Sequence, residues 1–138
     1  MRALLLLSLL TLGACASTPP PEPDPQQAWV TLATEPGDSL TAHELDGTRL
    51  SDGRYFQVPA GEHSLQVRYR FERTVAGNPM SMEATEITCF LRVRYTGFAA
   101  GQRYRFEARP LAAKAQGWLY DEQRQAVARA NVLRCGPY

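Results

Sequence analysis

Three stretches in which apolar residues recur at every second position constrain the fold of this chain most strongly. In residues 63–73 the apolar residues recur at every second position from 65 to 71, and the polar residues between them include Gln66, Arg68 and Arg70. The same alternation recurs in residues 87–95 and 103–108. Side chains two residues apart lie on one face of a β-strand, so each stretch predicts a half-buried strand. The apolar sets are Leu65, Val67, Tyr69 and Phe71, then Ile87, Cys89, Leu91, Val93 and Tyr95, then Tyr104, Phe106 and Ala108.

Shorter strands are expected around these three. Residues 29–33 and 55–58 favour strands, residues 39–45 favour a strand less clearly, and Asp46-Gly47 predicts a tight hairpin turn into residues 48–50. Pro110 is expected to end the strand that begins at residue 103. Residues 118–120 and 126–132 flank the segment 121–125. Either they are two further strands joined there by a turn, or a short helix starts with Asp121 as its N-cap; the hairpin is favoured.

These elements predict an all-β fold, an antiparallel β-sandwich of about seven or eight strands that occupies residues 28–138. The 138 residues contain 44% hydrophobic and 21% charged residues, which is ordinary for one globular domain. The formal net charge is +1, so bulk electrostatics give no reason to expect nucleic acid as a partner.

The start of the chain has the form of a bacterial export signal. Arg2 precedes a leucine-rich apolar run of about half the length that a membrane-spanning helix needs. The sequence Leu12-Gly13-Ala14-Cys15 resembles the lipobox of bacterial lipoproteins. The resemblance implies that residues 1–14 are a signal peptide, that Cys15 carries a lipid such as palmitate, and that Ala16 directs the protein to the outer membrane. The alternative is a plain signal peptide followed by a chance cysteine.

Residues 15–27 are expected to link the lipidated cysteine to the domain. Prolines 19, 20, 21, 23 and 25 remove backbone donors and favour an extended polyproline II conformation. This segment therefore predicts a semi-rigid tether between the membrane and the folded domain.

Two short segments of the domain resemble known envelope modules. Asp46-Gly47 and the later segment 58–67, which reads VPAGEHSLQV, resemble PEGA-type surface modules and small bacterial envelope lipoproteins. Residues 101–106, which read GQRYRF, are similar to a strand of those lipoproteins. These families imply a β-sandwich in the cell envelope and no enzymatic activity.

The cysteines and histidines offer little for catalysis. With Cys15 lipidated, Cys89 and Cys135 remain in an oxidising compartment, where a disulfide is expected; a catalytic thiol is the alternative. His43 and His63 are the only histidines, and their spacing matches no metal site. No nucleophile, phosphate-loop or metalloprotease motif occurs, so we expect no enzyme, no cofactor and no metal.

Arginines form the one constellation that suggests binding. Three pairs with i, i+2 spacing lie on three expected strands: Arg68 and Arg70, Arg92 and Arg94, and Arg103 and Arg105. If these strands are neighbours, six guanidinium groups share one sheet face with Phe90. Such a face would bind lipopolysaccharide phosphates, peptidoglycan carboxylates or an acidic protein. The alternative is a solvated outer face whose charge is neutralised by glutamates.

The sequence thus favours a non-enzymatic outer-membrane lipoprotein that faces the periplasm as an accessory or envelope-binding module. A second hypothesis is a periplasmic inhibitor or chaperone-like partner that uses the loop 74–81 or an open sheet edge. A third is an enzyme whose cleft is assembled from residues with no local motif.

Overall fold

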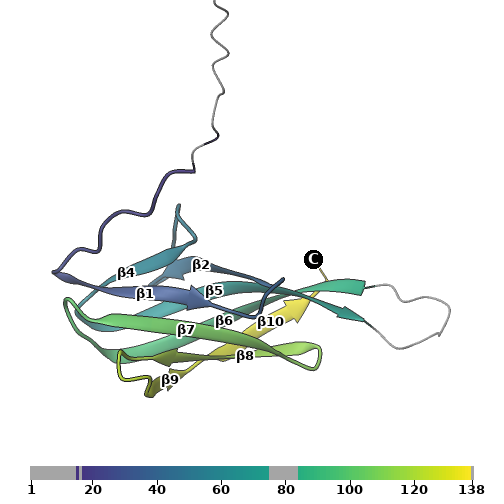
Figure 1. The fold of residues 1–138 in the computed structure, drawn as a ribbon. Helices are drawn as coiled ribbons and strands as arrows, with labels where there is room; N and C mark the ends of the chain where they lie inside the picture. Colours follow the sequence, from purple (N-terminus) through teal and green to yellow (C-terminus); the bar gives the residue numbers. More distant parts are fainter. Residues whose placement is uncertain (1–14, 16, 75–83, 138) are drawn as a thin grey trace, which may run out of the picture.

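The computed structural model describes residues 15, 17–74 and 84–137, and in these residues the chain is all-β with no helix. Ten strands form two five-stranded sheets (Figure 1). The first sheet has the order β4 (Tyr55–Pro59), β1 (Gln27–Ala33), β7 (Arg103–Leu111), β8 (Lys114–Tyr120) and β9 (Ala126–Arg129). The second has the order β10 (Asn131–Gly136), β6 (Ala84–Phe98), β5 (Gly61–Thr74), β2 (Ser39–Leu45) and β3 (Thr48–Arg49).

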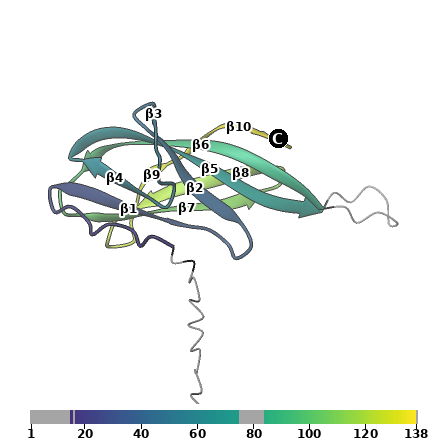
Figure 2. The ribbon, with the colours of Figure 1, turned by 90° about the horizontal axis from the view of Figure 1, so that it is seen from above.

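The two sheets lie as two layers around one hydrophobic core (Figure 2). The apolar sets of the three alternating stretches point into this core, as the sequence predicts. The largest fully buried side chains come from both sheets and include Tyr69, Phe56, Phe106, Leu65 and Leu91. Burial of apolar surface of this kind is the main favourable term that holds the two layers together.

The predicted all-β class is confirmed, but the expected strand number and the purely antiparallel pairing are wrong. The described residues form ten strands, and β1 runs parallel to β7, with Val30 beside Tyr104. The stretch 126–132, expected as one strand, is two. The chain leaves β9 near Ala130, whose N–H donates to the carbonyl of Gly117, and it continues as β10 in the other sheet.

Pro110 does not end β7, contrary to the expectation from sequence. The strand continues to Leu111, with Pro110 opposite Ala115 of β8. Ala108 and Pro110 are two residues apart, so their backbone groups point to the same side of β7. The Ala108 carbonyl accepts a hydrogen bond from the Thr34 hydroxyl at 3.1 Å, which shows that this side faces β1. Since β1 itself ends at Ala33, the missing N–H of Pro110 lies where no strand needs it.

Both hairpins favoured by the sequence are present. Asp46 and Gly47 have φ angles of 50° and 81°, as the two central residues of a type I′ turn require. The Asp46 carboxylate accepts the Ser64 N–H at 2.8 Å and lies 2.6 Å from the His63 Nδ1 atom. These hydrogen bonds, first the one from Ser64 and then the one from His63, lower the pKa of Asp46.

The second hairpin joins β8 to β9 through residues 121–125, so the alternative of a helix is wrong. The Asp121 carboxylate accepts the N–H of Gln125 at 2.8 Å, and the Asp121 N–H donates to the Gln125 carbonyl at 3.0 Å. Arg124 has a φ of 60° within this turn. The side chain of Asp121 thus closes a turn instead of capping a helix.

The predicted disulfide between Cys89 and Cys135 is present. It joins β6 to β10, where the two cysteines lie directly opposite each other. Since β10 is the edge strand of its sheet, the disulfide holds the end of the described chain against a central strand.

Candidate functional site

The outer face of the second sheet brings together four of the six arginines singled out from the sequence. β5 and β6 are antiparallel neighbours, with Arg68 opposite Phe90 and Gln66 opposite Arg92. Arg68, Arg70, Arg92 and Arg94 alternate with buried residues in both strands, so all four lie on the surface that faces away from the core.

Arg103 and Arg105 do not belong to this surface, which corrects the expectation of six guanidinium groups on one face. Both are in β7, which pairs with β1 and β8 in the first sheet. Alternation looks the same for a strand of either sheet, because it shows only which side of the strand is buried. The guanidinium of Arg105 is moreover held by Glu107, with 2.8 Å between Nε and Oε1.

A fifth arginine, Arg134 of β10, joins the four on the second sheet. It pairs with Phe90 across the strands, and its guanidinium carbon lies 4.2 Å from the centroid of the phenyl ring. This is a cation–π contact. The His43 ring lies 5.1 Å from the same phenyl ring. We call Arg68, Arg70, Arg92, Arg94 and Arg134 the arginine face.

The arginine face contains a groove of about 480 Å³ beside β10. Its lining residues come from β5, β6 and β10 and are Arg68, Arg70, Glu86, Thr88, Phe90 and Arg134. Glu86 lies 3.8 Å from the Arg70 guanidinium. The Arg68 Nε atom is buried and has no hydrogen-bond partner among the residues that the structure describes.

A second, smaller hollow of about 290 Å³ lies on the same face, toward the β2–β3 hairpin. Arg92 and Arg94 line it together with the carboxyl-bearing residues Glu44 and Asp46. Arg92 donates a long hydrogen bond of 3.4 Å to the Gln66 side chain. Two arginines and two carboxylates cancel in charge, so this hollow attracts an anion less strongly than the groove does.

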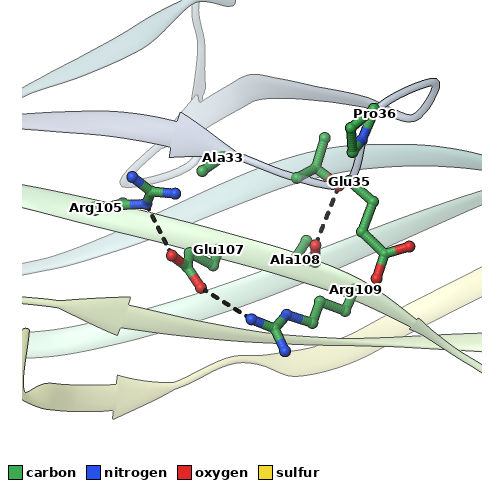
Figure 3. Close-up of a pocket in the computed structure, with 8 residues that line it drawn as sticks. Ala33, Glu35, Pro36, Arg105, Glu107, Ala108 and Arg109 are labelled. Carbon is green, nitrogen blue, oxygen red and sulfur yellow. Dashed lines mark hydrogen bonds and ion pairs between the residues drawn. The ribbon is translucent and has the colours of Figure 1, made fainter.

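The first sheet offers a pocket of about 280 Å³ beside the end of β1 (Figure 3). Arg105 and Arg109 reach the two carboxylate oxygens of Glu107, at 2.8 Å and 3.7 Å, and Glu35 adds a second carboxylate. Its two positive and two negative side chains balance, and Glu107 already holds both guanidinium groups. This pocket therefore lacks an unmet charge that a ligand would neutralise.

The two histidines do not line the groove or the smaller hollow. Burial and, next, the neighbouring Arg49 lower the pKa of His43, so its ring is neutral at neutral pH and packs beside Phe90. His63 is paired with the Asp46 carboxylate of the hairpin. Within residues 15, 17–74 and 84–137, no group of three or more His, Cys, Asp or Glu side chains could hold a metal ion.

Cys15, the expected lipidation site, is exposed and is not in a disulfide. Residues 17–24 form no strand and are exposed, and Arg54 donates a 2.7 Å hydrogen bond to the Thr18 carbonyl before the chain enters β1. In the part of the chain that the structure describes, no helix is long and apolar enough to cross a membrane. Residues 1–14 and 75–83, to which the expected signal peptide and most of the loop 74–81 belong, lie outside the described residues.

Comparison with family models, with curated proteins and with solved structures finds no match for this chain. The site therefore has to be interpreted from its own geometry.

Arg134 is the residue that the sequence analysis did not single out, although a signal for it exists. Arg134 directly precedes Cys135, and Phe90 directly follows Cys89. Once those cysteines are paired across antiparallel strands, the next pair in register is Arg134 with Phe90. The predicted disulfide therefore implies that Arg134 lies opposite Phe90.

Proposed function

We propose that this protein is a lipoprotein of the bacterial cell envelope, anchored through Cys15 in the outer membrane with its domain in the periplasm. The support is the lipobox-like sequence that ends at Cys15, followed by an exposed proline-rich segment without strands. The ten-strand domain of two packed sheets is then a β-sandwich on a tether, as the resemblance to PEGA-type and small envelope lipoproteins implies.

Metabolic labelling with a clickable palmitate analogue tests the anchor. The wild-type chain should be labelled and should fractionate with the outer membrane, and the Cys15→Ala variant should lose both properties. Cys135→Ser is the matched control, because it removes a cysteine of the domain and should keep the label. A Cys15→Ala variant that is still labelled would contradict the lipidation at Cys15.

We further propose that the domain is a non-enzymatic module that binds an anionic component of the envelope. The observation that carries this proposal is the arginine face, which gathers five guanidinium groups on one sheet. On the other sheet, Arg105 and Arg109 are both paired with Glu107. Guanidinium groups bind phosphate and carboxylate oxygens in a bidentate manner, which suits such a role.

Crosslinking in intact cells tests this proposal. The double variant Arg92→Glu/Arg94→Glu should change the set of crosslinked partners, because it reverses two charges of the arginine face. The matched control is Arg103→Glu/Arg105→Glu, which has the same i, i+2 spacing on the other sheet. If both variants keep the wild-type profile, the arginine face is only a solvated surface.

A second candidate function is a periplasmic inhibitor or chaperone-like partner, favoured by the edge strand β10. Val132 and Leu133 of this strand are 38% and 41% exposed, and β10 is bonded to a strand on one side only. An edge of this kind can accept a strand from another protein. Co-purification of one protein in stoichiometric amount, lost on Leu133→Lys, would favour this function.

A further inference from the structure

The groove beside β10 carries positive charge that no carboxylate of the groove pairs with. Three of its lining residues are arginines, Arg68, Arg70 and Arg134, and one is a carboxylate, Glu86. Glu86 lies 3.8 Å from Arg70, so it offsets the charge of that residue. Among the described residues, no carboxylate lies within ion-pair distance of Arg68 or Arg134. The groove thus keeps two positive charges on the side chains that line it.

Arg68 supplies a second, independent indication of a ligand. Its Nε–H group is buried and has no acceptor among the described residues. A buried donor on a charged group is costly when it is left unsatisfied, because it has lost its hydrogen bonds to water. Since Arg68 lines the groove, an oxyanion there can bind its guanidinium group, whereas a purely apolar ligand would leave that charge without a partner.

Phe90 gives the groove an apolar surface between the arginines. Its ring is only partly buried, lines the groove, and is held by the Arg134 guanidinium at 4.2 Å. Arg134 itself is next to Cys135, whose disulfide to Cys89 fixes β10 in register with β6. The arginine and the ring are therefore positioned before any ligand arrives, which lowers the entropic cost of binding.

We propose that this groove binds a phosphate monoester attached to a flat or apolar group, with the phosphate on Arg68 and Arg134 and the apolar group against Phe90. A phosphate monoester carries close to two negative charges at neutral pH, which matches the two unmet charges of the groove; a carboxylate carries only one. The inference rests on the proposed function of the arginine face as a ligand-binding surface, and it names the chemistry of the ligand.

The source of the phosphate is either a soluble ester or a lipid. The groove lies on the second sheet, whereas the tether leaves the domain beside the first sheet (Figure 2). The groove therefore opens on the layer away from the tether. A ligand that is not part of the anchoring membrane fits this arrangement.

Calorimetric titration of the full-length lipoprotein, kept in a non-ionic detergent, tests the inference with phenyl phosphate as the probe. Phenyl phosphate should bind at least about tenfold more tightly than benzoate, which has the same ring with one charge, and than inorganic phosphate, which lacks the ring. Arg68→Gln and Arg134→Gln should each weaken binding about tenfold or more. Arg109→Gln, on the other sheet, is the control and should bind as the wild type does.

Short-chain phosphatidic acid below its micelle concentration forms the second arm. Tighter binding of this lipid than of phenyl phosphate would support a lipid-borne phosphate, and weaker binding would support a soluble ester. The inference is overturned if phenyl phosphate shows no saturable binding, if benzoate binds equally well, or if both arginine variants bind as the wild type does. If this titration fails while Arg92→Glu/Arg94→Glu still alters the crosslinked partners, the proposed function stands and only the phosphate ligand is wrong.

Discussion

The disulfide between Cys89 and Cys135 should account for a large part of the stability of this domain. The two cysteines are 46 residues apart. In the chain-entropy model a loop of this length restricts the unfolded state by about 4 kcal/mol at room temperature. The free energy of unfolding of a domain of this size is roughly 5–15 kcal/mol, so the loss of the disulfide would remove a large part of it.

Cys135→Ser is the most suitable perturbation, because Cys135 is only partly buried whereas Cys89 is fully buried. The Cys89 thiol that remains behaves as a small apolar side chain, so little of the core is disturbed. We expect the free energy of unfolding to fall by about 4 kcal/mol, which lowers the urea midpoint by roughly 2 M. The dependence on urea should also steepen, because an unfolded chain without the crosslink exposes more surface.

Urea unfolding followed by tryptophan fluorescence, with and without reductant, measures both quantities. The reduced wild type should unfold like Cys135→Ser, and the reductant should leave Cys135→Ser unchanged. A loss below about 1 kcal/mol with an unchanged urea dependence would refute the reasoning, since the crosslink would then not restrict the unfolded chain as the model assumes.

Three further changes test the core and the turns. Gly117→Ala should lower the free energy of unfolding by about 2 kcal/mol, because the added Cβ would lie 2.7 Å from the Phe106 ring. Combining it with Phe106→Leu in a double-mutant cycle should recover part of that loss. If the effects of the two substitutions are additive, the clash with the ring is not the cause. Asp46→Asn should destabilise the protein at neutral pH. The hydrogen bonds of Asp46 lower its folded pKa, so the effect should be complete above the ordinary value of 3.8 and should shrink as the pH falls through the lower folded value; a difference from wild type that does not vary with pH would contradict this. Tyr69→Phe should cost about 2 kcal/mol in denaturant unfolding, because the buried hydroxyl donates to the Asp38 carboxylate at 2.5 Å, and an unchanged midpoint would show that this bond contributes nothing.

Several features of the fold follow from the sequence because they depend on neighbouring residues or on simple chemistry. Alternation in residues 63–73 and 87–95 shows which side chains enter the core, since strand geometry fixes which residues share a face. Asp46-Gly47 specifies its turn because both residues accept positive φ angles. The pairing of Cys89 with Cys135 follows from elimination once Cys15 is assigned to lipid.

The sheet to which each strand belongs was decided only by the tertiary structure. The alternation in β7 is the same as in β5 and β6, yet β7 pairs with β1 in the other sheet and carries Arg103 and Arg105 away from the arginine face. The parallel pairing of β1 with β7 has no local signal either, because it joins segments more than 70 residues apart.

The groove depends on both the sequence and the tertiary structure. Arg68, Arg70 and Phe90 are evident in the sequence as outward-facing residues. The sequence alone does not show that Arg134 lies over Phe90, or that the Arg68 Nε atom has no acceptor among the described residues. The contact between Arg134 and Phe90 forms when the edge strand β10 pairs with β6. The sequence determines which side of each strand is polar. Long-range strand pairing determines which polar groups meet, because the backbone hydrogen bonds that join two strands are the same whatever side chains the strands carry.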